Sequence, residues 1–188
     1  ELEQKSQVRF RARRLHPDYN SSLPGSTLKG RVLEAAPFDG RALGPMFGLV
    51  REPIPEFTVL GGMMVNQEDV LNFLSAGRSW RAFRHSAGLL ARHAADRLSH
   101  PRGTRLMMGN ALAARLLISL RDRNVPVLLK ATVTAMEADK GSPSSVSIVQ
   151  DGVTRRLSCR GGFISATGGF NRQDRQDVRG LDRAVAPD

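Results

Sequence analysis

The chain has 188 residues, of which 40% are hydrophobic, so it holds enough apolar material for one globular domain or for part of a larger one. Cys159 is the single cysteine, which excludes an internal disulfide and a metal cluster held by several cysteines. The formal net charge of +10 is carried almost wholly by arginines spread along the sequence, and only 5% of the residues are aromatic. This pattern favours a solvated, arginine-rich surface over a nucleic-acid site.

The sequence has no segment typical of a membrane or an exported protein. No apolar run approaches the roughly eighteen residues that cross a bilayer. The N-terminal stretch ELEQKSQVRFRARR lacks the apolar centre of a signal peptide. We therefore expect no membrane insertion and a cytoplasmic location.

The first third of the chain is rich in loop signals. Polar and apolar residues alternate over residues 7–12, QVRFRA, which predicts a strand with one buried face. Residues 16–55 then hold most of the prolines and many glycines, which predicts a long ordered loop region. Its expected apolar anchors are Tyr19, Phe38, Met46 and Phe47.

Helical patterns occupy residues 66–123. The first helix is expected to be capped by Asn66 and to end at Gly77, the second to run from Ser79 to Leu98, and the third to run from a cap at Asn110 to Arg123. Apolar residues at three- and four-residue spacing are expected to face the core. They are Val70, Leu71 and Leu74, then Trp80, Phe83, Ala87, Leu90, Ala94 and Leu98, and finally Leu112, Leu116 and Leu120.

Beyond Asn124 the pattern changes to short β-type runs. VPVLLKATVTAMEA, SVSIVQ and TRRLSC are separated by the turn signals DKGSPS and DGV, which predicts a three-stranded antiparallel meander. The apolar run GFISATGGF follows it. This order predicts an α/β fold, or α+β for the chain taken alone.

The histidines do not indicate a metal site. His85 and His93 are eight residues apart on the second helix, whereas helical zinc ligands are usually three or four residues apart. No third ligand accompanies them, so we expect no metal. Motifs of hydrolases and of nucleotide triphosphatases are also absent from the sequence.

A glycine pair interrupts the last apolar run, in GFISATGGFNR at residues 162–172. Glycine has no Cβ, so its backbone can approach a bulky, phosphate-bearing ligand. A glycine pair after a strand is also a common turn. The residues by themselves leave both interpretations open.

Two longer stretches resemble a known family. GNALAARLLISLRDRNVPVLLKATVTAME and VSIVQDGVTRRLSCRGGFISATGGF together resemble the end of the flavin-binding domain in fumarate reductase and 3-ketosteroid dehydrogenase flavoproteins. Upstream, PDYNSSLPGSTLKGRVLEAAPFDGRALG looks like the narrower 3-ketosteroid dehydrogenase branch. The resemblance implies part of a glutathione-reductase-type FAD-binding domain, with FAD as the cofactor of the full-length protein.

The same resemblance implies roles for particular residues. The backbone of Val133, on the strand before the meander, is expected to contact the adenine. The tyrosine of the Asp-Tyr segment, Tyr19, is expected near the substrate, where it assists catalysis; the alternative is that Tyr19 only anchors its loop. The turn expected to approach the FAD diphosphate and ribose consists of Ala166, Thr167, Gly168 and Gly169.

The sequence also departs from the family pattern. The Gly-x-Gly-x-x-Gly turn of such flavoproteins is expected before Glu1, and their substrate-capping domain after the GGF segment. Asn171 stands where an acidic residue is common. We therefore expect the chain to be the middle of a flavoenzyme, and to be inactive and weak in FAD binding by itself.

These observations lead to one main hypothesis and two alternatives. The main hypothesis is a fragment of an FAD-dependent dehydrogenase that acts on a 3-ketosteroid or similar cyclic ketone, with hydride moving to the flavin while a base removes the neighbouring proton. One alternative is a fumarate reductase-like flavoprotein, and the other is a basic module without flavin that binds nucleic acid or another anion. The expected division is residues 1–105 near the substrate, 106–175 around the cofactor, and 176–188 at the start of the capping domain.

Overall fold

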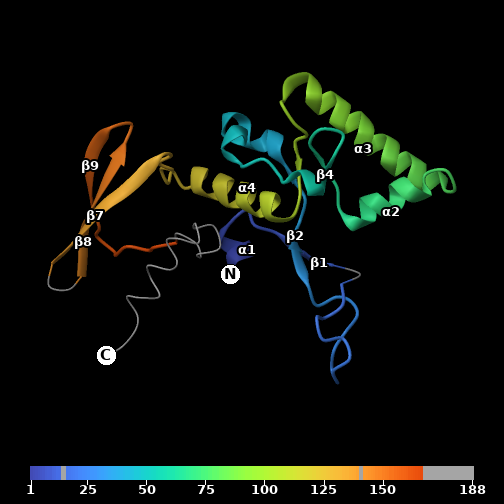
Figure 1. The fold of residues 1–188 in the computed structure, drawn as a ribbon, viewed down its shortest axis with the longest axis horizontal. Helices are drawn as coiled ribbons and strands as arrows, with labels where there is room; N and C mark the ends of the chain where they lie inside the picture. Colours follow the sequence, from blue (N-terminus) through green and yellow to red (C-terminus); the bar gives the residue numbers. More distant parts are fainter. Residues whose placement is uncertain (14–15, 140–141, 167–188) are drawn as a thin grey trace, which may run out of the picture. The chain divides into compact units, whose positions relative to one another are not determined.

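The chain forms two compact units, Glu1–Val127 and a second unit that begins at Leu128 (Figure 1). The structure is a computed structural model and describes residues 1–13, 16–139 and 142–166. Both units contain β-strands and the first also contains the helices, so the expected mixture of helix and strand is confirmed.

The first unit alternates short strands with helices. In chain order its elements are α1 (Leu2–Lys5), β1 (Phe10–Ala12), β2 (Leu33–Ala35), β3 (Phe38–Asp39), the 3-10 segments η1 (Gly40–Leu49) and η2 (Pro55–Phe57), β4 (Thr58–Val59), β5 (Met63–Met64), α2 (Gln67–Ser75), α3 (Trp80–Ser99), β6 (Arg105–Leu106) and α4 (Met108–Arg121).

Three antiparallel strand pairs tie the loops of this unit together. They join β1 to β2, β3 to β6 and β4 to β5. The strand expected over residues 7–12 is confirmed only from Phe10 onward, although Val8 just before it is fully buried. The pairing of Phe38 with Leu106 connects the long loop region to the residues that precede α4.

Of the two helix caps predicted from the sequence, the one at Asn66 is confirmed and the one at Asn110 is not. Asn66 caps α2 through a reciprocal capping box with Asp69, and Ser79 caps α3 by accepting from the backbone N–H of Ala82. The cap predicted at Asn110 is wrong, because α4 begins after Met107. Asn110 lies inside the helix, and its side-chain amide donates to the Arg51 carbonyl.

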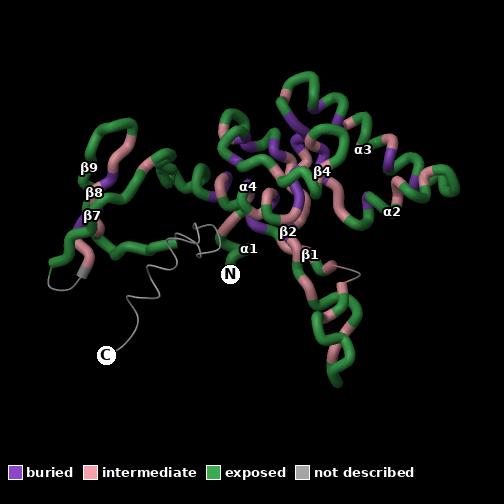
Figure 2. Tube along the Cα trace, viewed as in Figure 1, coloured by how far each residue is buried: buried purple, intermediate pink, exposed green. Residues whose placement is uncertain are grey.

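The core of the first unit lies where α4 meets the strands and η1. Figure 2 shows buried stretches gathered around α4 and its neighbours. The helix contributes Ala111, Ala114 and Ile118 to this core, rather than a full leucine stripe. Small residues let the backbone of α4 approach η1 closely. The remaining buried members of the core are Ala35, Leu43, Phe47, Val50, Met64, Leu106 and Met107.

The apolar faces predicted for α2 and α3 are not the buried faces, which corrects that part of the sequence analysis. Asp69 is the buried residue of α2, and α3 buries Ala82, Ser86, His93 and Asp96. Asp69, His93 and Asp96 have hydrogen-bond partners outside their own helix, which favour the burial of that face. The buried hydroxyl of Ser86 has no partner among the described residues. The residues found exposed instead are Val70, Leu71, Leu74, Trp80, Phe83, Leu90 and Leu98.

The second unit contains a three-stranded antiparallel sheet of β7 (Ala131–Asp139), β8 (Ser142–Gln150) and β9 (Val153–Ser158), in that order. Val146 and Ile148 of the central strand are its buried hydrophobic residues, and Ser145 beside them is buried too. The register of β7 against β8 shifts after Val133 and again after Glu137. Strand β7 is therefore an irregular edge strand of this sheet.

Neither a membrane span nor a metal centre is found in the described parts of the chain. None of the helices there is both long enough and apolar enough to cross a bilayer. Likewise, histidine, cysteine and carboxylate side chains do not come together there in groups of three or more that could hold a metal ion.

Candidate functional site

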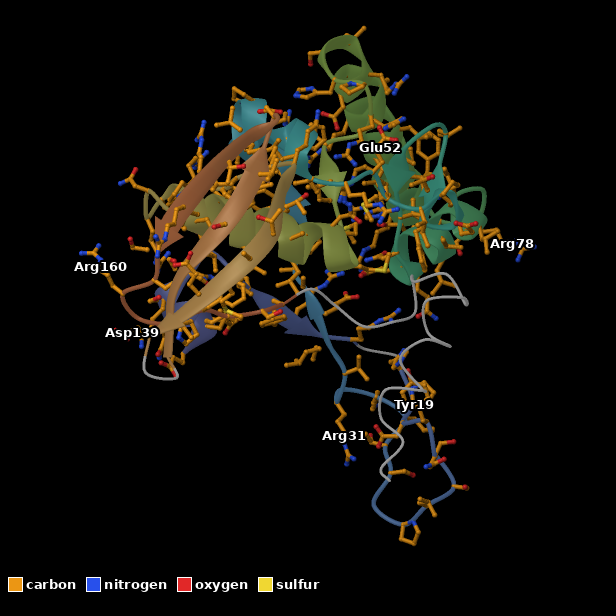
Figure 3. All side chains as sticks on the ribbon, turned by 60° about the vertical axis from the view of Figure 1, so that its left-hand side comes forward. Tyr19, Arg31, Glu52, Arg78, Asp139 and Arg160 are labelled. Carbon is orange, nitrogen blue, oxygen red and sulfur yellow. The ribbon has the colours of Figure 1, made fainter. Side chains whose placement is uncertain are left out.

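Tyr19 lies on a loop that Asp18 holds in shape. The Asp18 carboxylate accepts from the Thr27 backbone N–H at 3.0 Å and forms an ion pair with Arg31 at 3.0 Å. In addition, the Asp18 backbone N–H donates to the Thr27 carbonyl. Figure 3 shows Tyr19 and Arg31 on this loop. The loop is thus a closed structure, since both of its sides are joined by hydrogen bonds.

The side chain of Tyr19 is fully exposed, with a relative accessibility of 101%. It packs on no part of the described chain, so Tyr19 does not anchor its loop, and the alternative interpretation of this residue is wrong. The anchoring role belongs to Asp18. Tyr19 is left with its ring and its hydroxyl free to contact another molecule.

At the base of this loop, a hollow of ≈ 630 Å³ lies between the β1–β2 pair and the start of α2. Arg11 and Arg13 both pair with Glu34 on its wall, at 2.7 and 3.5 Å. Its lining residues are Arg11, Ala12, Arg13, Glu34, Asn66, Gln67, Glu68 and Leu71. The arginines already have a carboxylate partner, so the hollow offers no strong charge of one sign.

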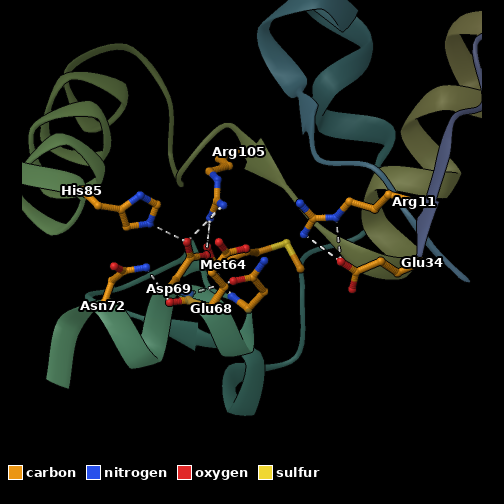
Figure 4. Close-up of polar contacts among 9 residues, drawn as sticks. Arg11, Glu34, Met64, Glu68, Asp69, Asn72, His85 and Arg105 are labelled. Atoms are coloured by element: carbon orange, nitrogen blue, oxygen red, sulfur yellow. Dashed lines mark hydrogen bonds and ion pairs between the residues drawn. The ribbon is translucent and has the colours of Figure 1, made fainter. Parts of the chain in front are cut away.

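Asp69 is a buried carboxylate that joins three elements (Figure 4). Its oxygens accept from Arg105 at 2.8 Å and from the Asn66 backbone at 3.0 Å, and lie 2.9 Å from Nε2 of His85. Burial acts to raise the pKa of Asp69, but the hydrogen bonds from Arg105, Asn66 and His85 outweigh it and lower the pKa below its ordinary value. The carboxylate therefore stays charged and connects α2, α3 and β6.

A second carboxylate, Asp96, joins α3 to the segment before β6. One oxygen of its buried side chain accepts from both the backbone N–H and the hydroxyl of Thr104, each at 2.8 Å. Nearby, the hydrogen bond from Arg41 is the main cause that lowers the pKa of Asp39. These contacts fix the ends of β3 and β6, and so they serve the fold rather than a reaction.

Two arginines hold loops through backbone carbonyls, which corrects the expectation that the arginines form a solvated surface. Arg102 is only 6% exposed; it donates to the carbonyls of Arg51 and Val50, and its guanidinium lies 4.7 Å from the centre of the Phe47 ring. Burial lowers the pKa of Arg102. Arg115 donates to the carbonyls of Gln7, Ala36 and Pro37.

The residues expected to contact the cofactor lie in the second unit. Val133 is half exposed on β7, whose outer edge has no strand partner among the described residues. Ala166 is exposed at the end of the described chain. Thr167, Gly168 and Gly169 lie outside the described residues. Tyr19 belongs to the first unit, so the predicted residues are divided between the two units.

Sequence reasoning missed the buried polar residues. The capping pattern at Asn66 placed Asp69 in the first turn of α2, but nothing in the spacing marked Arg105 as its partner, 36 residues further on. No sequence pattern identified Arg102 or Arg115 as a loop-holding residue either, because their hydrogen-bond acceptors are backbone carbonyls rather than particular side chains.

Comparisons with known proteins agree on one kind of protein. The chain matches a family described as FAD binding domain over residues 1–187. It is 32% identical over 171 residues to a 3-oxosteroid 1-dehydrogenase of Mycolicibacterium smegmatis, covering 87% of this chain and 29% of that protein. A 4-oxocyclohex-2-ene-1-carboxylate 5-dehydrogenase of Sinomonas cyclohexanicum is 29% identical, covering 90% of this chain and 29% of that protein.

One solved structure has the same fold over most of the chain. It is a 3-ketosteroid Δ1-dehydrogenase from Sterolibacterium denitrificans in complex with 1,4-androstadiene-3,17-dione, with a TM-score of 0.77 and 24% sequence identity. The match covers 95% of this chain and 32% of that one. The chain therefore spans about 29% of the length of the curated relatives it matches.

Proposed function

Since the chain belongs to the family of FAD binding domains, we propose that it is part of an FAD-dependent oxidoreductase that dehydrogenates a 3-ketosteroid or a similar cyclic ketone. One observation supports this most directly. Two of the curated relatives, from different organisms, are both named as dehydrogenases of a ring that carries an oxo group, and each aligns with at least 87% of the chain. The main hypothesis from the sequence is thus kept, and the similarity gives no support to a basic module without flavin.

The described residues fit an FAD group at one place. Strand β7 pairs with β8 alone, so among the described residues its outer row of backbone N–H and C=O groups is available to a ligand. We propose that the backbone of Val133 contacts the adenine there, and that the turn from Ala166 to Gly169 contacts the diphosphate and ribose. FAD, when bound, supplies the acceptor for the hydrogen taken from the substrate.

Tyr19 is the residue of this chain that we propose for catalysis. Its phenol can donate a hydrogen bond to the oxygen of a ketone, which draws electrons from the ring and makes the neighbouring C–H bonds easier to break. The exposure of the side chain supports this role, since the hydroxyl has no competing partner among the described residues. Asp18 and Thr27 position it by closing the loop.

The type of FAD domain, the division of the chain and the cellular location are proposals as well. We propose a glutathione-reductase-type FAD domain, with residues 1–105 near the substrate, 106–175 around the cofactor and 176–188 leading into a capping domain. We also propose a cytoplasmic location. The chain spans about 29% of the length of the curated relatives it matches, and we propose that by itself it shows no turnover and weak FAD binding.

The experiment that tests the function uses the full-length protein. It is expected to be yellow, with flavin absorbance that is bleached under anaerobic conditions by a 3-ketosteroid and not by succinate. A colourless protein, or one whose flavin is reduced only by the dicarboxylate, would contradict the proposal. The second result would favour the fumarate reductase-like alternative.

Tyr19→Phe removes the hydroxyl and keeps the ring. Because general acid or hydrogen-bond assistance contributes about 100-fold or more to rate, flavin reduction by the steroid is expected to slow by about that factor in stopped-flow measurements. Ser22→Ala removes a hydroxyl from the same exposed loop and is expected to leave the rate unchanged. A Tyr19→Phe rate within twofold of the parent's would rule out the catalytic role.

A further inference from the structure

The position of the Tyr19 phenol is decided by the backbone of its loop, because the side chain is fully exposed and packs on no described residue. We call residues 18–31 the Tyr19 loop. Its base is closed by the hydrogen bonds between Asp18 and Thr27. A functional group is held in place either by its own packing or by the residues that support it. The groups that tie this loop together therefore also place the phenol.

Arg31 ties two points of the Tyr19 loop to each other. Its Nη1 lies 3.0 Å from the Asp18 carboxylate, and its Nη2 donates to the Gly25 carbonyl at 3.0 Å. Asp18 comes directly before Tyr19 in the chain, whereas Gly25 comes after it, on the returning half of the loop (Figure 3 labels Tyr19 and Arg31). Because the guanidinium is rigid and planar, its two nitrogens fix the distance between these two points.

The Asp18 carboxylate has two partners with different effects. The same oxygen, Oδ2, accepts from the Thr27 backbone N–H and pairs with Arg31. Without the Arg31 side chain the Thr27 bond remains, so the base of the loop stays closed while Gly25 loses its tie. An ion pair whose arginine is 61% exposed contributes little to global stability. Arg31 therefore restricts the shape of the loop more than it opposes unfolding of the unit.

The part of the loop that surrounds the phenol carries no charge. From Tyr19 to Leu28 the sequence contains no Asp, Glu, Lys or Arg, although 24% of the chain is charged. Leu23 and Leu28 in this stretch are exposed, as Tyr19 is. Asp18 and Arg31 lie outside the stretch and pair with each other. The exposed surface of the loop thus suits a neutral, apolar ketone, and the charges serve to hold the loop.

We propose that Arg31 is a positioning residue, which holds the Tyr19 loop in the shape that brings the phenol to the oxo group of the substrate. This inference rests on the proposed function. Arg31 acts through Asp18 and Gly25 and does not itself bind the substrate. A misplacement of about 1 Å can lower a rate by about 100-fold, so an exposed tie can affect turnover far more than stability.

The test is a double-mutant cycle on the full-length protein, measured as flavin reduction by a 3-ketosteroid in a stopped-flow instrument. Arg31→Ala is expected to lower the limiting rate at saturating steroid by roughly tenfold. The steroid concentration that gives half of this rate is expected to change by less than about twofold. In the Tyr19→Phe background, Arg31→Ala is expected to change the rate by less than about twofold, because the hydroxyl that Arg31 positions is already absent.

Two further variants separate the tie from the charge. Arg31→Lys keeps a cation beside Asp18, but a single ammonium does not reproduce the planar bridge to Gly25. It is expected to restore part of the rate that Arg31→Ala loses. Lys29→Ala is the matched control, since it removes an exposed charge of the same loop that has no ion pair among the described residues. Its rate is expected to lie within about twofold of the parent's.

Amide hydrogen exchange reports on the loop without any turnover. In Arg31→Ala, residues 18–31 are expected to exchange faster than in the parent and in Lys29→Ala, while the other residues exchange as before. This measurement keeps the two proposals distinguishable. A parent protein whose flavin is not reduced by the steroid would contradict the proposed function, whereas the exchange rates test the tie itself.

Three results would overturn the inference. The first is a limiting rate of Arg31→Ala within about twofold of the parent's. The second is an equal loss of rate in the parent and in the Tyr19→Phe background, which would mean that Arg31 does not act through Tyr19. The third is hydrogen exchange over residues 18–31 that Arg31→Ala leaves unchanged.

Discussion

Single buried carboxylates carry much of the organisation of the first unit. Asp69 is 1% exposed and accepts hydrogen bonds from three different elements, including its own helix cap. A buried carboxylate is stable only when such partners replace the water it has lost. Asp69 therefore specifies which face of α2 is turned inward, more strongly than the leucines of that helix do.

Replacing Asp69 by Asn keeps the shape of the side chain and removes its charge. At neutral pH, Asp69→Asn is expected to lower the free energy of unfolding by roughly 1–3 kcal/mol, because Arg105 loses its charged partner. The measurement is urea unfolding of the parent and the variant. Asp122→Asn, at a partly exposed site, serves as control and is expected to change the stability by less than about 0.5 kcal/mol.

The effect of Asp69→Asn depends on pH in a defined direction. The pKa of Asp69 is lower in the folded state than its ordinary value of 3.8. Its contribution to stability is thus fully present above about pH 4 and is lost as the pH falls through the lowered folded pKa. The difference between parent and variant should be constant from neutral pH down to about pH 4 and should shrink below it. A constant difference down to the lowest pH would contradict the charged role.

At the scale of the element, α3 shows how polar contacts outweigh an apolar stripe. His93 contacts the Leu60 carbonyl through Nε2 at 2.9 Å, and Asp96 binds Thr104. Both residues lie on the face opposite to much of the apolar stripe. Gly103 allows the close approach of the chain to this face, since a Cβ there would lie 2.9 Å from Nδ1 of His93 and 3.0 Å from the Gly62 carbonyl oxygen.

Two glycine substitutions separate this packing effect from helix propensity. Gly103→Ala is expected to destabilise the fold by about 1–3 kcal/mol, because the methyl group meets both His93 and a backbone oxygen. Gly88→Ala lies within α3 with no atom close to the added methyl, so it is expected to stabilise by up to about 1 kcal/mol. Thermal unfolding of both variants measures whether each substitution raises or lowers the stability. If Gly103→Ala stabilised the fold as Gly88→Ala is expected to do, the packing around Gly103 would not be tight.

For the whole molecule, the charge of +10 has more than one use. Arg102 and Arg115 point inward and bind carbonyls, where a planar guanidinium with several donors is needed. Arg78, Arg81 and Arg84 are exposed instead, and none of them forms an ion pair within the described part of the chain. The net charge alone therefore does not identify a partner, since part of it stabilises loops.

Arg102→Lys leaves the net charge of the molecule unchanged and tests whether the guanidinium group itself is needed at this position. Lysine cannot reach several carbonyls in one plane or stack on Phe47 in the same way, so a loss of about 1–3 kcal/mol in unfolding free energy is expected. Arg155→Lys on the exposed strand β9 is the control, expected within about 0.5 kcal/mol of the parent. Urea unfolding at constant ionic strength provides the comparison. Equal stability of both variants would show that charge alone is sufficient at position 102.

The sequence by itself determined the local elements and the family. Three features depend on residues close together in the chain, which is why spacing reveals them. They are the helix cap at Asn66, the approximate positions of the three helices over residues 66–123, and the resemblance to FAD-dependent dehydrogenases. Only the tertiary structure decided which helix faces are buried, that Tyr19 is exposed while Asp18 holds its loop, and that Asp69 meets Arg105. Those features depend on contacts between distant residues, where hydrogen bonding of buried charges outweighs the local apolar pattern.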